Sequence, residues 1–108
     1  MKIIRNSIIP VKGYAAMNFC GLLFVRKEVK IDEVTINHEK IHTAQMKELL
    51  YVFFYILYVL EWVLNLFRYG FNHRAYRMIS FEREAYAHEH QLWYKYSRKH
   101  FAQWRNND

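Results

Sequence analysis

The longest apolar run of the chain extends from residue 49 to residue 67 and reads LLYVFFYILYVLEWVLNLF. Its spacing predicts a helix over residues 49–69. A helix that is apolar nearly all round must be enclosed by a core, by a second copy of the chain or by lipid, and a domain this small offers little core. Membrane embedding is therefore the preferred interpretation. The few polar groups form one narrow stripe, which we expect to face the chain's own domain or a second copy: Tyr58, Glu61, Asn65 and Arg68.

Residues 32–48 have the spacing of a second helix, which no Gly or Pro interrupts. Asp32 or Thr35 is suited to cap its N-terminus, because both side chains can accept a hydrogen bond from a free backbone N–H group. The apolar positions available for packing are Val34, Ile41, Ala44 and Met46.

A third helix is predicted over residues 80–98. Ser80 is a suitable N-cap, and Glu82 and Glu84 follow it in the first turn, where acidic side chains are favourable. Residues 70–80, which begin with a glycine, are expected to form a connection.

The N-terminal segment 1–31 is expected to be a β segment. Residues 21–26, GLLFVR, indicate a short buried strand, and residues 14–19 are its candidate partner in a hairpin. The first 17 residues contain no continuous apolar run of signal-peptide length, so we do not expect secretion through a cleaved signal peptide. The elements together predict one mainly helical α+β domain over residues 1–108, with a short hairpin and about three helices.

Composition limits the partners. Sixteen Lys and Arg against ten Asp and Glu give a formal charge of +6, but the basic residues are spread over both halves of the chain. They match no nucleic-acid-binding motif, so a solvated basic surface is favoured and nucleic acid is not an expected partner. Cys20 is the single cysteine, which excludes an internal disulfide framework and any Cys-rich metal cluster.

The candidate chemistry lies in residues 38–42, which read HEKIH. On a helix, His38 and His42 are one turn apart on the same face and can direct two imidazoles at one zinc ion. Glu39 is one step round the helix, within reach of a metal-bound water but not of the metal, which is the position of a general base. The motif requires a third ligand, which we expect from a glutamate in the acidic segment 80–87.

The pairing of His38-Glu39-Lys40-Ile41-His42 with Phe81-Glu82-Arg83-Glu84-Ala85-Tyr86 resembles the gluzincin metallopeptidases whose second motif reads FExxAD. The chain is also similar to a group of short bacterial proteins with HExIHxxQ, a Glu-Trp pair in an aromatic helix, and FEREAY. The resemblance covers about residues 32–90. It implies a minimal zincin-like domain in which His38, His42 and Glu82 bind Zn²⁺ and Glu39 activates water.

The same resemblance implies that a strand beside the HExxH helix binds an extended peptide, for which residues 21–26 are the candidate. It also implies a location in the bacterial cytoplasm or at the cytoplasmic membrane.

Three further residues are candidates around the metal. Tyr86 replaces the aspartate of the FExxAD motif, so the carboxylate that would orient a ligating histidine is missing there. Glu84 is the nearest substitute, although it can equally be solvated, and Tyr86 can instead stabilise the oxyanion. Gln45 shares a face with His38 and can contact the ligands or the substrate. Glu84 and His88 are also spaced as a metal-binding pair, but an exposed polar face is the favoured interpretation.

The expected function is zinc-dependent hydrolysis of peptide bonds in a peptide or protein substrate. The alternative from another class is a non-catalytic zinc-binding or membrane-associated regulatory domain, and a basic interaction module without metal is the weakest interpretation. A membrane and a second copy of the chain are the other partners compatible with the sequence.

Overall fold

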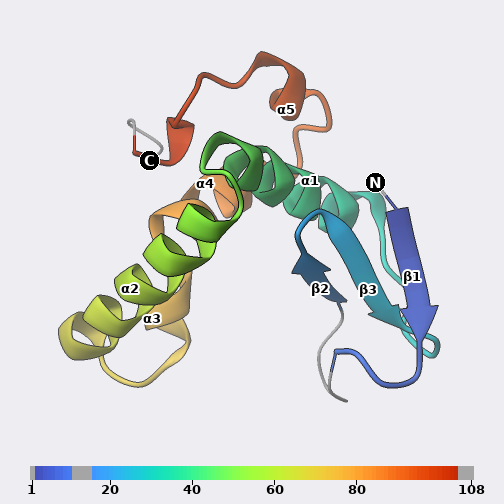
Figure 1. Ribbon diagram of the computed structural model, residues 1–108, viewed down its shortest axis with the longest axis horizontal. Helices are drawn as coiled ribbons and strands as arrows, with labels where there is room; N and C mark the ends of the chain where they lie inside the picture. Colours follow the sequence, from blue (N-terminus) through green and yellow to red (C-terminus); the bar gives the residue numbers. More distant parts are fainter. Residues whose placement is uncertain (1, 11–15, 105–108) are drawn as a thin grey trace.

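The computed structural model describes residues 2–10 and 16–104 (Figure 1). Over these residues the fold is α+β and mostly helical. The sheet lies beside α1, and α2 extends away from the C-terminal end of that helix (Figure 1). The helices are α1 (Glu33–Glu48), α2 (Val52–Tyr69), α3 (His73–Arg77), α4 (Ser80–His88), α5 (Tyr94–Ser97) and the 3-10 helix η1 (Ala102–Trp104).

The sheet contains β1 (Lys2–Asn6), β2 (Ala16–Phe19) and β3 (Leu22–Arg26), in the order β1-β3-β2. Strands β2 and β3 are antiparallel and form the predicted hairpin, of which residues 14 and 15 lie outside the described part. Its two-residue turn has positive φ at Cys20 and Gly21, as tight hairpin turns require.

The sequence analysis missed strand β1. It pairs parallel with β3, from Lys2 beside Leu22 to Asn6 beside Arg26. Its sequence, KIIRN, places two isoleucines next to each other and so lacks the alternation of a half-buried strand. The strand depends on a partner about twenty residues away, which local patterns do not reveal.

Helix α1 begins where the sequence predicted, because the Asp32 carboxylate accepts a hydrogen bond from the backbone N–H of Thr35 at 2.8 Å. Helix α2 begins at Val52, three residues later than predicted. Leu50 and Tyr51 both have positive φ, at 55° and 62°, a conformation that interrupts a right-handed helix. The chain changes direction there, and α2 leaves α1 at an angle (Figure 1).

Polar residues attach α2 to the rest of the chain. The Tyr58 hydroxyl donates to Glu82 at 2.6 Å, and the Asn65 side-chain amide donates to the carbonyl oxygen of Ala75 at 3.1 Å. Glu61 accepts from both the backbone N–H and the hydroxyl of Ser80. Three members of the predicted polar stripe therefore face their own domain, while Arg68 is exposed.

Two predictions for residues 70–80 were wrong. The connection contains the short helix α3, and Ser80 is not the cap of α4, because Ile79 occupies that position. The carboxylate of Glu61 accepts from the Ser80 N–H at 2.9 Å and from its hydroxyl at 2.7 Å. An acidic group from α2 thus satisfies the N-terminus of α4, where negative charge is favourable.

The predicted helix over residues 80–98 is also shorter than expected. Helix α4 ends at His88, and the chain resumes helical structure only in α5. The side-chain amide of Asn37 on α1 faces three carbonyl oxygens there, those of His88, Glu89 and Gln91, at 2.8 to 3.3 Å. This tertiary contact stabilises the turn, which sends the C-terminal segment back across α1 (Figure 1).

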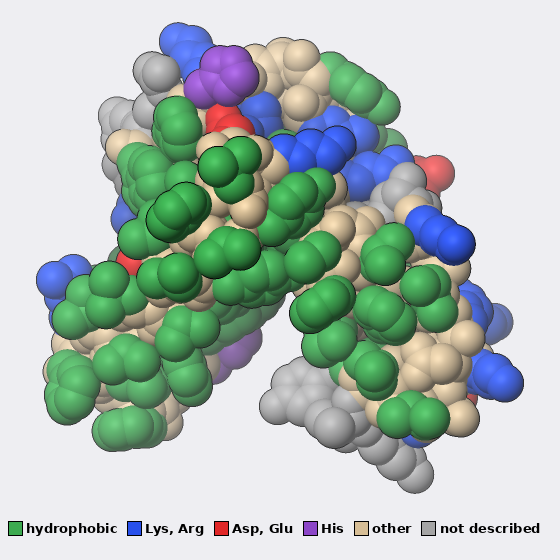
Figure 2. Space-filling model, viewed as in Figure 1, with side chains coloured by type: hydrophobic (Ala, Val, Ile, Leu, Met, Phe, Trp, Pro, Cys, Tyr) green, Lys and Arg blue, Asp and Glu red, His purple; other side chains and the backbone are tan. Residues whose placement is uncertain are grey.

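The core lies where α1, α2 and α4 meet, and its buried apolar residues include Met46, Phe54, Ile79 and Phe81. By contrast, only Phe54 and Asn65 of α2 are buried. Hydrophobic side chains cover the outer side of α2 in Figure 2. By length and composition α2 is also able to cross a membrane. The described part of the chain does not enclose α2, so the membrane and the second copy remain the predicted partners.

Candidate metal centre

Helices α1 and α4 bring the three predicted metal ligands together. His38 Nε2 lies 3.2 Å from His42 Nε2, and the Glu82 Oε1 atom lies 3.1 Å from each of these nitrogens. A tetrahedral zinc ion with bonds of about 2.0–2.1 Å holds its ligand atoms about 3.3 Å apart. The triangle therefore has the size that three ligands of one zinc ion require.

The ligand set is enclosed by protein, with each of the three residues only 4% to 6% exposed. Burial would lower the pKa of His42, but the Glu82 carboxylate outweighs it and raises that pKa to about 9. Burial would raise the pKa of Glu82, but the two histidines and Tyr58 outweigh it, and the pKa lies well below its usual range. Without metal, a proton on His42 thus compensates the buried carboxylate.

This proton predicts the pH dependence of zinc binding. Because the pKa of His42 is about 9, zinc must displace a proton at any lower pH. We expect the apparent affinity to rise about tenfold per pH unit from pH 7 towards pH 9 and to level off above it. Titration with a competing zinc chelator at several pH values measures this slope. A flat profile between pH 7 and pH 9 would contradict the arrangement described here.

A relay of side chains orients His42. Its Nδ1 atom lies 2.7 Å from Gln45 Oε1, and the Gln45 amide nitrogen donates to Glu84 at 2.9 Å and to the carbonyl oxygen of Phe81 at 3.0 Å. Gln45 and Glu84 are both fully buried. Gln45 thus connects a ligand on α1 with a carboxylate on α4, and it fixes which ring nitrogen of His42 faces the metal position.

The expectation that Glu84 lies on an exposed polar face was wrong. Its carboxylate accepts hydrogen bonds from the guanidinium of Arg98 at 2.7 and 2.9 Å and from the Tyr94 hydroxyl at 2.7 Å. The C-terminal segment covers Glu84 because the chain turns back after α4. His88 points elsewhere, stacked on the Tyr94 ring at 3.7 Å, so it does not form a metal-binding pair with Glu84.

Glu89 is the residue that sequence reasoning missed. Its Oε2 atom lies 3.3 Å from His38 Nδ1, so it provides the carboxylate partner that Tyr86 cannot. Glu89 is the C-cap of α4 and lies seven residues after Glu82, about two helical turns, which places both on one face. This seven-residue spacing from Glu82 is the feature of the sequence from which Glu89 could have been predicted.

We predict that Glu89→Gln weakens zinc binding roughly 10- to 100-fold, as is usual when the partner of a ligating histidine is removed. The fold should survive, because Glu89 lies at a helix end and Asn37 binds its backbone carbonyl, not its side chain. Glu33→Gln, which alters an exposed carboxylate in the first turn of α1, is the matched control. If the two variants bound zinc with equal affinity, Glu89 would not contribute to the metal site.

Glu39 lies beside the ligands on the wall of a cleft of about 240 Å³, which His42 and Glu82 also line. Burial raises the pKa of Glu39, and the two histidines oppose this effect. A raised carboxyl pKa suits a group that must accept a proton and then return it. Glu39 therefore remains the predicted general base.

Strand β2 forms the opposite wall of this cleft, through residues 16–18. The Asn18 amide attaches the strand to α1 by donating to the Glu39 carbonyl oxygen at 2.9 Å and to the Thr43 hydroxyl at 3.1 Å. The prediction that residues 21–26 bind substrate was wrong, because β3 is the central strand and both its edges are paired. Within the described residues, β2 is the edge strand beside the site.

Two tyrosines lie near the ligands. The Tyr86 ring packs edge-on against the His38 ring, with centroids 4.5 Å apart, and its hydroxyl lies 3.4 Å from that of Tyr76. Tyr76 lines the cleft together with Glu39, whereas Tyr86 lines the adjoining aromatic cavity. Tyr86 remains an oxyanion donor predicted from the sequence, but Tyr76, which lines the cleft itself, is the better placed of the two.

In comparisons with protein-family models, curated proteins and solved structures, no match to this chain was found. The chemical interpretation therefore rests on the geometry of the site.

Proposed function

We propose that the protein is a zinc-dependent metallopeptidase with a minimal zincin-like domain. The observation that carries this proposal is the buried triangle of His38, His42 and Glu82. Its donor set, two imidazoles and one carboxylate, is one that catalytic zinc sites use, and it leaves a fourth position for water or substrate.

Bound zinc would lower the pKa of a coordinated water and polarise the carbonyl group of the substrate. The remaining steps belong to the chain itself. Glu39 accepts a proton from the attacking water and returns it to the leaving amine. Tyr58 binds the second oxygen of Glu82 at 2.6 Å, which leaves Oε1 directed at the metal position. Tyr76 or Tyr86 donates a hydrogen bond to the oxyanion.

The substrate is an extended peptide that adds to the outer edge of β2 near Ala16, because the carbonyl oxygen of Asn18 on that edge already accepts a hydrogen bond from the Tyr55 hydroxyl at 3.3 Å. An adjoining cavity of about 770 Å³ has room for an apolar side chain of this peptide. Its lining is largely aromatic and includes Trp62, Phe71, Tyr76 and Tyr86.

The test is cleavage of a peptide library by the purified, zinc-loaded protein. We expect cleavage that a chelator abolishes and added zinc restores, with a preference for substrates with an apolar residue at the scissile bond. If zinc is bound and no cleavage is found, the protein is a non-catalytic zinc-binding domain instead.

A further inference from the structure

The outer face of α2 is apolar and unpartnered in the described part of the chain. Five of its residues recur at helical spacing and are between 52% and 83% exposed: Phe53, Ile56, Leu60, Leu64 and Phe67. The opposite face is attached to α3 and α4 by the hydrogen bonds of Tyr58, Glu61 and Asn65. The apolar face therefore points away from the domain along the whole helix.

These attachments limit how α2 can meet a membrane. Its 18 residues reach about 27 Å, close to the thickness of the hydrocarbon core. However, if α2 spanned the bilayer it would draw α4 in with it, including Glu82 and the exposed Arg83. Charged side chains are costly within lipid. If α2 lies in the plane of the interface instead, its apolar outer side enters the lipid while its polar side stays attached to the domain.

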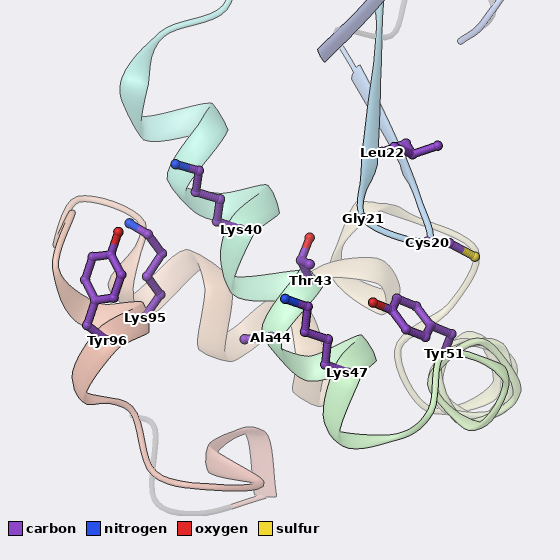
Figure 3. A pocket seen from close by; sticks show the side chains of 10 residues that line it. All are labelled: Cys20, Gly21, Leu22, Lys40, Thr43, Ala44, Lys47, Tyr51, Lys95 and Tyr96. Atoms are coloured by element: carbon purple, nitrogen blue, oxygen red, sulfur yellow. The ribbon is translucent and has the colours of Figure 1, made fainter. Parts of the chain in front are cut away.

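A basic cavity of about 530 Å³ adjoins the start of α2 (Figure 3). Lys40 and Lys47 enter it from one face of α1, since they are seven residues apart, and Lys95 enters from α5. Tyr51, the N-cap of α2, lines the same cavity. Among the described residues that line it there is no Asp or Glu, so its positive charge is not neutralised from within.

The cavity also supplies neutral donors. Two tyrosines, Tyr51 and Tyr96, line it with their side chains (Figure 3), whereas the Thr43 hydroxyl already donates to the Glu39 carbonyl oxygen at 3.1 Å. The Lys95 ammonium group donates to the carbonyl oxygen of Leu92 at 2.7 Å and to the side-chain oxygen of Asn37 at 3.5 Å, which leaves one of its three N–H bonds. Ammonium groups together with hydroxyls form a suitable environment for a phosphate oxygen.

The apolar face and the basic cavity belong to the same side of the molecule. In Figure 2, basic side chains gather in the upper part of the molecule, above the hydrophobic side chains over α2 and over the sheet. Phe19 and Leu22, at the tip of the hairpin, are exposed and extend the apolar surface past the cavity. An anionic surface with an apolar interior complements both features.

We propose that this side docks on an anionic lipid bilayer, with α2 in the plane of the interface and a phospholipid phosphate in the cavity formed by Lys40, Lys47 and Lys95. The net charge of +6 favours the same partner. This inference goes beyond the proposed hydrolysis and does not depend on it.

The test is co-sedimentation of the purified full chain with vesicles of phosphatidylcholine alone or with phosphatidylglycerol added. We expect wild type to prefer the anionic vesicles. Lys40→Gln with Lys47→Gln should lower binding to them roughly tenfold or more, because each lysine near the surface contributes separately. Lys27→Gln with Lys30→Gln removes the same charge at exposed positions far from the cavity and should change binding less than about twofold.

A second pair of substitutions tests whether the apolar face of α2 contributes to membrane binding. Ile56→Gln with Leu60→Gln alters only exposed positions, so the fold should persist, as the circular dichroism spectrum will show, while vesicle binding falls. Equal binding to neutral and anionic vesicles, or equal loss in the two lysine pairs, would overturn the proposal. Bound protein that alkaline washing cannot release would also overturn the proposal, because it would mean that α2 spans the bilayer. A dimer that α2 holds together in the absence of vesicles would overturn it as well. Binding of inorganic phosphate without vesicle binding would assign the cavity to a soluble anion and overturn it too.

Discussion

Glu39→Gln is expected to reduce peptide hydrolysis by roughly 10² to 10⁴-fold, the range that removal of a general base produces. Glu39 lies on the wall of the cleft beside His42 and Glu82 but is not part of the ligand triangle. The amide of glutamine has nearly the same shape as the carboxylate and cannot accept the proton. The turnover number should therefore fall while zinc content and substrate binding stay close to wild type.

The measurement is a comparison of zinc content and turnover for Glu39→Gln and the control Glu33→Gln. The control makes the same substitution at an exposed position in the first turn of the same helix. Loss of zinc from Glu39→Gln together with activity would mean that Glu39 is a ligand. Full activity would mean that another group is the base.

The second large effect is expected for Glu82→Gln, which should weaken zinc binding by more than about 100-fold. Loss of the hydrogen-bond partner of a ligand already weakens metal binding 10- to 100-fold, and Glu82 is one of the three proposed ligands themselves. The thermal stability provides an independent readout. Zinc in 100-fold excess over its dissociation constant should stabilise wild type by about 2.7 kcal/mol, whereas the variant should gain almost nothing at the same concentration.

Glu82→Gln replaces one of the two carboxylate oxygens by an NH2 group, so that a single oxygen is left to accept from Tyr58 or to face the metal position, and the fold of the variant must be checked by circular dichroism. Tyr58→Phe removes the same hydrogen bond without removing the ligand and is the matched comparison. We expect Tyr58→Phe to keep most of the zinc affinity. If Glu82→Gln bound zinc as tightly as Tyr58→Phe does, Glu82 would not be a ligand.

The sequence predicted those features that depend on residues close together in the chain. The helix that carries His38 and His42 has a local cap, Asp32, and a regular apolar spacing, and it formed as predicted. The hairpin of β2 and β3 likewise depends on neighbouring residues and a two-residue turn. Glu82 was placed by the resemblance, and α4 brings it to the histidines.

The features that were missed depend on contacts between distant residues. Glu61 satisfies Ser80 from nineteen residues away, and Asn37 stabilises the end of α4 from a different helix. Because α4 ends there, Arg98 returns to bury Glu84, which the sequence placed either near the ligands or on an exposed polar face. Local helix signals do not encode these tertiary contacts, so the predicted bounds of α4 and the exposed polar face of Glu84 were both wrong.

The central claim is that His38, His42 and Glu82 hold one zinc ion. X-ray absorption spectroscopy of the protein loaded with one equivalent of zinc tests it most directly, combined with metal analysis after gel filtration. The account predicts one zinc per chain with a first shell of nitrogen and oxygen atoms at about 2.0–2.2 Å and scattering from two imidazole rings. Protein that keeps no zinc, or a zinc shell without two imidazoles, would contradict it.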